Sequence, residues 1–455
     1  MSVTGEDTIA AIATAPGAAG ISVIRISGRD ALAVADRVVK TGGRKPSERR
    51  GFTFFHARMV DGSGSVVDDG LVLIMRGPRS YTGEDVVELQ GHGGDVQARR
   101  LLRCALEAGA RPADPGEFTR RAFVNGRMDL TQAEAVLDVI RARSDAAAAS
   151  AMEQLQGGLS TRIDGMYEGL IGVSADLEAT LDFPEDELPE AVMGEVRGRL
   201  DKVWHDLEGL LSTWTEGRLL REGAAVVIAG RPNVGKSTLL NGLLGLERAI
   251  VADVPGTTRD TIEETLVLDG IPIRLIDTAG LREADCVIER EGIRRSREQL
   301  ERADLFLYVY PAPEGLTEED RVALGRMDGR RLVLVANKCD LGMEGEGEGA
   351  IAASLVRGEG LAEIRERMLA CLRGGEGRSR EHHAAISERH RHLLERARGE
   401  LAAARELLAT VGEEARQALA CDHLSHGLDA LAEVTGRSVH HDLLDAIFSR
   451  FCIGK

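Results

Sequence analysis

The chain has 455 residues, 43% of them hydrophobic and only 3% aromatic, and its formal net charge is −17. The length suggests about three domains. The negative charge argues against a generally basic nucleic-acid-binding protein, although a local basic patch or binding through a partner stays open. The six cysteines lie far apart without a CxxC pair, and we find no basic leader and no long uncharged apolar run. We therefore expect a cytoplasmic protein in a reducing compartment, with no membrane segment.

The first 121 residues are rich in glycine and in short apolar runs. "GISVIRISG" (20–28) and "GLVLIMRGP" (70–78) predict strands, because turn residues bound both runs. Residues 95–109 have the apolar spacing of a helix. This part is predicted to be a compact α+β domain.

The next part, residues 122–221, has a helical pattern throughout. Thr131 is a candidate helix cap, with Glu134 three residues later as in a capping box. An acidic, proline-containing break is expected at 181–190, "LDFPEDELPE". Residues 377–455 return to helical patterns, as in 392–411.

Between these helical parts, residues 222–376 alternate apolar strand-like runs with helix-like segments, which predicts a mostly parallel sheet. The low-complexity segment 342–353, "GMEGEGEGAIAA", is expected to be a flexible loop. The simplest fold class is multidomain, α/β plus α, with an α/β domain inserted into a discontinuous helical domain. The predicted parts are residues 1–121, 122–221, 222–376 and 377–455.

A phosphate-binding motif, "GRPNVGKST" (230–238), follows an apolar strand and precedes a helix, as its chemistry requires. Gly230 and Gly235 let the backbone curl around phosphate, Lys236 reaches the terminal phosphates, and Ser237 ligates Mg²⁺. The alternative is a glycine-rich turn that binds nothing.

Two further motifs favour GTP. Asp277 of "DTAG" (277–280) can hold Mg²⁺ through water, and "NKCD" (337–340) carries Asp340, whose carboxylate accepts two N–H bonds from guanine. Thr258 in "GTTRD" is a second Mg²⁺ ligand candidate, and "SLVRGEG" (354–360) stands where a last guanine loop belongs, with Leu355 in place of the usual Ala. The predicted GTP-binding residues are Asn233, Val234, Gly235, Lys236, Ser237, Thr238, Ala252, Asp253, Val254, Pro255, Gly256, Thr257, Thr258, Asp277, Thr278, Ala279, Gly280, Asn337, Lys338, Asp340 and Ser354.

The group that activates water is not evident from these motifs. Leu281 follows "DTAG" where Ras-like enzymes place a water-orienting glutamine, and leucine cannot do that work. Asn233 can ligate a monovalent cation such as K⁺, which would supply positive charge at the phosphates. It can equally be a plain turn former, and the loop alone leaves both interpretations open.

The chain resembles the MnmE (TrmE) family of tRNA modification GTPases over essentially its full length. The resemblance rests on the phosphate loop with Asn233, "AIVADVPGTTRD", "LIDTAGLRE", "SYTGEDVVELQGHGG", "PGEFTRRAFVNGRMDLTQAEAV" and the terminal "FCIGK". It implies a homodimer joined by the N-terminal domain, which binds a tetrahydrofolate derivative, in 5-formyl or methylene form. It also implies K⁺-dependent pairing of two GTPase domains. With the FAD-dependent partner MnmG, in a heterotetramer or larger complex, such enzymes modify carbon 5 of the wobble uridine of certain tRNAs. Whether tRNA is bound directly or through the partner stays open.

The resemblance also implies residue roles. The K⁺ ligands would be Asn233 with backbone carbonyls of Ala252, Val254 and Thr257, and the water-orienting glutamate would be Glu289. The folate site would use Arg25, Glu88, Arg127 and Lys455. The alternatives are a solvated helical turn for Glu289, a strand-edge ion pair for Arg25 and solvated surface for Arg127.

The terminal "FCIGK" places Cys452 four residues from the end. Gly454 and Lys455 do not fit a prenylation box, and the apolar helical spacing up to Phe451 predicts that this end docks rather than frays. The resemblance puts Cys452 beside the folate, where a thiolate would add to carbon 6 of uracil or serve redox chemistry. Several histidines cluster without zinc-site spacing and are expected on the surface, namely His382, His383, His390, His392, His423 and His426.

Two other functions stay open. A ribosome-assembly GTPase shares these motifs but usually carries a basic RNA-binding appendage, which this acidic chain lacks. A non-catalytic GTP-driven dimerisation switch would signal without a direct role in chemistry.

Overall fold

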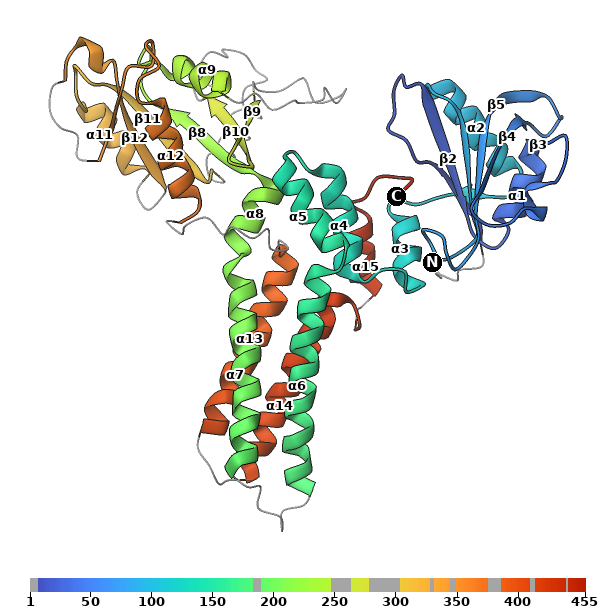
Figure 1. Ribbon diagram of the computed structural model, residues 1–455. Helices are drawn as coiled ribbons and strands as arrows, with labels where there is room; N and C mark the ends of the chain where they lie inside the picture. The colour runs from blue at the N-terminus through green and yellow to red at the C-terminus, as the bar shows by residue number, and fades with distance from the viewer. Residues whose placement is uncertain are drawn as a thin grey trace. The chain divides into compact units, whose positions relative to one another are not determined.

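The computed structural model describes residues 7–182, 190–246, 263–277, 303–327, 331–343, 349–374, 386–409, 414–438 and 441–455 (Figure 1). The chain forms two compact units. Unit 1 comprises Met1–Leu137, Ser160–Glu187 and Glu406–Lys455, and unit 2 comprises Asp138–Leu159 and Leu188–Arg405. Most of the break expected at 181–190 lies outside the described residues.

Unit 1 contains a seven-stranded sheet in the order β3-β4-β5-β6-β2-β1-β7. Neighbouring strands are antiparallel except β1 and β7, which are parallel. The strands predicted at 20–28 and 70–78 are confirmed as β2 and β5. The strands are β1 (Ile9–Ile12), β2 (Ile21–Ser27), β3 (Val39–Lys40), β4 (Thr53–Val60), β5 (Val66–Met75), β6 (Val86–His92) and β7 (Arg111–Pro112).

Helices α1 (Ala31–Val38) and α2 (Asp95–Glu107) cover one face of this sheet (Figure 1). The face beneath them is built from alternate strand residues, because side chains in a strand point to opposite faces. Its buried core includes Ile24, Ile26, Val72, Ile74, Val87 and Leu89. The opposite face carries exposed apolar side chains, among them Phe54, which is 72% exposed, and Leu71.

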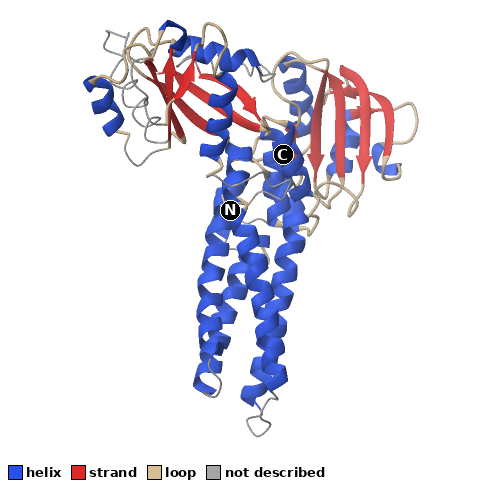
Figure 2. Ribbon diagram, turned by 60° about the vertical axis from the view of Figure 1, so that its left-hand side comes forward, coloured by secondary structure: helices blue, strands red, loops and turns tan. Residues whose placement is uncertain are grey.

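The rest of unit 1 is helical (Figure 2). A small core joins α3, α4 and α15 through Leu130, Ile447, Phe448 and Phe451. Arg437, which follows α14, pairs with Asp164 of α6 at 2.8 Å. The helices are α3 (Glu117–Val124), α4 (Leu130–Arg141), α6 (Gly158–Asp182), α14 (Glu414–Thr435) and α15 (His441–Phe448).

The predicted cap at Thr131 is wrong by two residues. The Asp129 carboxylate accepts from Gln132 N at 2.9 Å, and the Gln132 side chain accepts from Asp129 N at 3.0 Å. This is the reciprocal pattern of a capping box, with aspartate and glutamine in place of threonine and glutamate. Thr131 is instead buried and hydrogen-bonds Ser160 at 2.8 Å.

Unit 2 contains a six-stranded sheet in the order β13-β12-β11-β8-β10-β9, in which only the β9–β10 pair is antiparallel. Its central strand β8 is buried throughout, as expected for a strand covered on both faces. The strands are β8 (Ala224–Ala229), β9 (Glu263–Leu268), β10 (Ile271–Asp277), β11 (Leu305–Pro311), β12 (Leu332–Asn337) and β13 (Ile351–Ala353). The helices are α5 (Asp145–Leu155), α7 (Glu190–Ser212), α8 (Trp214–Glu222), α9 (Lys236–Leu246), α11 (Glu318–Gly325), α12 (Leu361–Leu372) and α13 (Glu388–Ala409).

The prediction of a flexible loop over 342–353 is wrong for its last three residues. Ile351–Ala353 form β13, which pairs in parallel with Val335–Asn337 of β12. Ile351 and Ala353 are buried, so this short run gains burial and backbone hydrogen bonds that its glycine-rich neighbours do not predict. Residues 344–348 lie outside the described residues.

The turn of the β9–β10 hairpin is fastened to helical segments. The Ser144 hydroxyl donates to Gly270 O at 2.6 Å and accepts from Ala147 N at 3.1 Å, so it caps α5 and ties that helix to the turn. Asp269 pairs with Arg373 after α12 at 2.8 Å. The cap also explains why the continuous helical pattern from 130 onward breaks between α4 and α5. Among the described residues, no helix is long and apolar enough to cross a membrane.

Ser144→Ala is expected to lower the free energy of local unfolding of α5 and the β9–β10 hairpin by about 1 kcal/mol, because a helix cap is lost. Native-state hydrogen exchange measures this at both segments. Ser212→Ala is the matched control, since Ser212 is exposed and bonds only Gly209 O of its own helix. Equal protection of α5 in both variants would contradict the prediction.

Candidate functional site

The loop that joins β8 to α9 has the geometry of a phosphate cradle. Gly230 and Gly235 have φ of +143° and +108°. A Cβ at Gly230 would collide with Val309 O, and one at Gly235 with Asn337 Nδ2. Only glycine fits these two positions, because the backbone passes close to its neighbours there. The loop then leads into the N-terminus of α9, which favours anions.

The polar side chains of this loop lie where the motif predicts. Lys236 is buried, and its Nζ donates to Gly230 O at 3.0 Å and to Arg231 O at 2.8 Å, which holds it inside the curl of the loop. Ser237 and Thr238 are exposed on the first turn of α9. Asn233 is also exposed, with φ of 61°, and its carbonyl accepts from Lys338 Nζ at 3.0 Å. Positive φ fits a turn former and leaves the amide side chain available, so both interpretations of Asn233 remain.

The guanine-binding motifs meet at one place. Asn337 Nδ2 donates to Val234 O at 2.7 Å, and its Oδ1 accepts from Leu355 N at 3.1 Å. Asn337 therefore ties the phosphate loop to the 354–360 loop and keeps a second amide hydrogen for a ligand. Ser354 Oγ donates to Asp340 Oδ1 at 2.8 Å. Leu355 contributes a backbone N–H and buries its side chain in the core, so the departure from alanine does not disturb this loop.

Two arginines of this region were missed by sequence reasoning. Arg357 lies 3.8 Å from Asp340 Oδ2, and Arg231 pairs with Asp320 at 3.1 Å and Glu314 at 3.0 Å. Asp320 is fully buried, and although burial opposes its charge, hydrogen bonds from Thr317 and Tyr308 and the Arg231 charge hold its pKa below the ordinary value. The Arg231 side chain is thus engaged in ion pairs with Glu314 and Asp320.

Several predicted GTP-site residues lie outside the described residues. Asp277 is the last residue of β10 and pairs with Ile228 of β8. The residues outside are Ala252, Asp253, Val254, Pro255, Gly256, Thr257, Thr258, Thr278, Ala279, Gly280 and Glu289.

A second polar site lies in unit 1, where the C-terminal tail docks. Arg25 Nε donates to Glu88 Oε1 at 2.9 Å, and Arg25 NH1 donates to Gly454 O at 3.5 Å. Lys455 follows directly, and burial together with the Arg25 charge lowers the pKa of its amine. Arg127 is exposed and donates to Ser80 O at 3.0 Å. The structure therefore brings Arg25, Glu88 and the tail together, and no described contact joins Arg127 to them.

The predicted docking of the tail is confirmed. Phe448 and Phe451 are buried with ring centroids 5.5 Å apart, and Gly116 N donates to Cys452 O at 3.4 Å. A Cβ at Gly454 would collide with Ile12 O. Cys452 itself is exposed, so its thiol faces solvent, two residues before the Gly454 carbonyl that accepts from Arg25.

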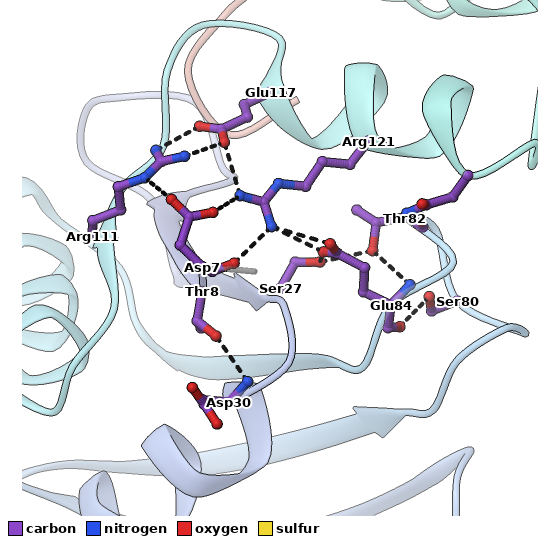
Figure 3. Close-up of polar contacts among 11 residues, drawn as sticks. Asp7, Thr8, Ser27, Asp30, Ser80, Thr82, Glu84, Arg111, Glu117 and Arg121 are labelled. Carbon is purple, nitrogen blue, oxygen red and sulfur yellow. Dashed lines mark hydrogen bonds and ion pairs between the residues drawn. The ribbon is translucent and has the colours of Figure 1, made fainter. Parts of the chain in front are cut away.

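Helix α3, on which the tail rests, is fixed by an ion network (Figure 3). Arg121 is 6% exposed and donates to Asp7 at 2.6 Å, to Glu117 at 2.9 Å and to both oxygens of Glu84 at 3.1 and 3.2 Å. Arg111 bonds Glu117 and Asp7 at 2.5 Å each. Burial opposes the charge of Glu117, but hydrogen bonds from Arg111, the Asp114 amide and Arg121 hold its pKa below the ordinary value.

One surface prediction is wrong. His390 is fully buried, its Nδ1 accepts from Ser387 N at 3.1 Å, and Ser387 Oγ accepts from His390 N at 3.2 Å. It closes a capping box at the start of α13, a role that spacing to other histidines does not show. His382 and His383 lie outside the described residues, while His392 and His426 are exposed.

The phosphate loop before α9, the aspartate at the end of β10 and the guanine motif after β12 define a P-loop GTPase domain.

Comparison with known proteins extends this to the whole chain. Residues 8–127 match the family "GTP-binding protein TrmE N-terminus", and residues 130–452 match "MnmE helical domain". The chain is 46% identical to the tRNA modification GTPase MnmE of Geobacter sulfurreducens, over 99% of both chains. It is 46% identical to that of Symbiobacterium thermophilum, over 99% of this chain and all of the relative. A solved G domain of the FeoB iron transporter of T. maritima covers 32% of this chain and 98% of its own, at 27% identity and a TM-score of 0.25. The chain belongs to the MnmE family of tRNA modification GTPases.

The ion network makes unit 1 sensitive to acid. Asp7 and Glu117 have depressed pKa values in the folded state, so their stabilisation is present above the unfolded values near 4 and is lost as pH falls through the folded values. We expect the free energy of unfolding of unit 1 to fall progressively as the pH drops below about 4.5. Denaturant titration at each pH, monitored by hydrogen exchange in α3, measures it.

Glu117→Gln should lower that free energy by about 3 kcal/mol at pH 7, since it leaves buried arginine charge uncompensated, and should flatten the acid dependence. Glu107→Gln, an exposed change on α2, is the control and should have little effect. An unchanged acid profile in Glu117→Gln would show that the network does not set this dependence.

Proposed function

We propose that this chain is a GTP-hydrolysing tRNA modification enzyme. With a FAD-dependent MnmG partner it adds an aminomethyl or carboxymethylaminomethyl group to carbon 5 of the wobble uridine of certain tRNAs, using a tetrahydrofolate one-carbon unit. The observation that carries the proposal is the full-length similarity to tRNA modification GTPases at 46% identity. No described feature favours a ribosome-assembly GTPase, and the net charge of −17 disfavours it.

GTP would bind with its phosphates in the loop before α9 and its base against Asp340 and the 354–360 loop. The exposed Ser237 hydroxyl stands at the N-terminus of α9, which suits Mg²⁺, with Thr258 as the second ligand. The exposed amide of Asn233, with backbone carbonyls of Ala252, Val254 and Thr257, would hold K⁺. When bound, these cations neutralise charge that develops on the phosphates. Lys236 orients the phosphates, and Glu289 would orient the attacking water.

The folate derivative would bind in unit 1 beside the tail. Glu88 uses Oε1 toward Arg25, and no described residue donates to its Oε2, which is therefore left to accept from an N–H of a reduced pterin ring. Arg25 and Lys455 complete the site, and Arg127 would reach the glutamyl tail of the ligand. Cys452, exposed beside them, would be the thiol that activates the uracil.

We place homodimerisation on the N-terminal part of unit 1. The open sheet face with Phe54 and Leu71 is apolar enough to be covered by a second copy. Two such copies with two MnmG subunits would form a heterotetramer or a larger complex, and tRNA would be bound by the chain or by MnmG. The domain boundaries would be 1–121, 122–221, 222–376 and 377–455.

The first test is GTP hydrolysis by the purified protein in KCl and in NaCl at equal ionic strength. We expect K⁺ to stimulate hydrolysis, and Asn233→Ala to lower the K⁺-stimulated rate about ten-fold or more while leaving the NaCl rate unchanged. Asn241→Ala, exposed on α9, is the matched control. Equal wild-type rates in the two salts would mean that Asn233 is only a turn residue and would remove the K⁺ site from the proposal.

The thiol is tested in the complex with MnmG, tRNA, GTP and the folate derivative. Cys452→Ser is expected to abolish tRNA modification while GTP hydrolysis continues, because serine is a much weaker nucleophile at neutral pH. Cys421→Ser is the control, on α14 of the same unit. Unchanged modification by Cys452→Ser would sink the catalytic role. Strong single-turnover modification when GTP hydrolysis is blocked would favour the switch alternative.

A further inference from the structure

The Arg25 side chain lies against two aromatic rings. Its guanidinium carbon is 5.2 Å from the centroid of the Tyr81 ring and 5.7 Å from that of Phe118. Both distances are within the range of cation–π attraction, which strengthens when the cation is shielded from water. The Arg25 side chain in its ion pair with Glu88 is only 15% exposed. The rings therefore act on a largely desolvated cation.

Neither ring is free to move. Phe118 is fully buried, and the Tyr81 hydroxyl hydrogen-bonds Thr119 Oγ1 at 2.8 Å, with Thr119 itself buried. Phe118 and Thr119 lie on α3, and Tyr81 lies on the loop before β6. The two rings are thus linked to each other as well as to Arg25.

The ion network locks the two segments that carry these rings (Figure 3). Glu84 belongs to the same loop as Tyr81, and Arg121 belongs to the same helix as Phe118. The Arg121 bonds to both Glu84 oxygens join loop to helix. Glu84 Oε2 also accepts from Ser27 Oγ at 2.7 Å, on the strand that carries Arg25. These bonds therefore fix the three elements around the Arg25 guanidinium, namely β2, the loop before β6 and α3.

Arg25 meets Glu88 through a single hydrogen bond. Arginine often pairs with a carboxylate through two parallel hydrogen bonds that occupy both oxygens. Here only Nε reaches Oε1, while NH1 turns to the carbonyl of Gly454. The second Glu88 oxygen is left for a ligand, and the tail is held at the same time.

We propose that Tyr81 and Phe118 are positioning residues for the ligand of this site. By fixing the plane of the Arg25 guanidinium, they keep Glu88 Oε2 available to accept from an N–H of a heterocycle such as a reduced pterin. They act through Arg25 and do not touch the reacting atoms. The inference rests on the proposed folate site and adds the residues that set its geometry.

Calorimetric titration of the full chain with 5-formyl-tetrahydrofolate tests the inference. Tyr81→Leu and Phe118→Leu should each weaken binding about five- to ten-fold. Tyr81→Phe keeps the ring and loses only its hydrogen bond to Thr119, so it should weaken binding less than Tyr81→Leu. Phe123→Leu is the control, since Phe123 lies on α3 but packs toward α15. Wild-type affinity in both leucine variants would overturn the inference. No binding by the wild type would overturn the folate assignment itself.

A spectroscopic measurement does not depend on the ligand. In arginine-labelled protein, the Nε–H signal of Arg25, assigned with Arg25→Lys, should be shifted by the ring currents of both aromatics. Tyr81→Leu should move it toward the ordinary position and Tyr81→Phe should not. If Phe118→Leu fails to fold, Tyr81→Leu decides the matter, because Tyr81 is only partly buried. An Arg25 signal that is the same in Tyr81→Leu and the wild type would show that the ring does not position the guanidinium.

Discussion

The site in unit 1 depends on one buried cation. Arg121 is almost fully enclosed, and its donors are divided among Asp7, Glu84 and Glu117, from three separate segments. A charge in this position is costly unless every partner is present, so the segments must assemble together or not at all. The network therefore fixes the position of α3. Residues of α3 in turn contact Arg25, Tyr81 and α15.

Each successive residue of α3 meets a different neighbour. Gly116, directly before α3, donates its N–H to Cys452 O of the tail. Phe118 packs against Arg25, and Thr119 hydrogen-bonds Tyr81. Arg120 pairs with Asp445 of α15 at 2.9 Å. A short helix can contact so many elements because its side chains radiate at about 100° per residue. The glycine cannot be replaced, since its φ is +67° and a Cβ would lie 2.6 Å from Phe448 O. Gly454 in the tail is constrained in the same way at a different contact, since its φ is +98° and a Cβ there would collide with Ile12 O.

The strands, the inserted α/β part and the phosphate loop could be predicted from sequence because each depends on local pattern. Glycines at fixed positions suffice for the loop, and short apolar runs bounded by turn residues suffice for β2 and β5. The Arg121 network could not, because Asp7 and Arg121 are 114 positions apart and no periodicity links them. The same reason explains the error at Thr131, whose burial against Ser160 is a tertiary fact, and at β13, whose strand forms only because β12 offers an open edge. The aromatic residues Tyr81 and Phe118 stood inside motif blocks already noted, but nothing local signals that they face an arginine 56 or more residues away in the sequence.

The two candidate sites share a physical device. Asn337 gives one amide hydrogen to Val234 O and keeps the other, and Glu88 gives one oxygen to Arg25 and keeps the other. In each case one half of a polar group fastens two segments of the protein, and the same bond orients the other half, which is the half assigned to the ligand in the proposed function. Such a group is already immobilised before binding, so little side-chain entropy is lost when the ligand arrives. As a consequence, truncating such a side chain changes the protein structure and the ligand contact together. Removing Asn337 or Glu88 would loosen the loops as well as delete a ligand contact, so the change in affinity would exceed the worth of the contact itself. Tyr81 and Phe118 contact Arg25 and are not assigned a contact with the ligand. Substituting them would therefore alter the orientation of Arg25 and Glu88 without removing the atoms that recognise the ligand.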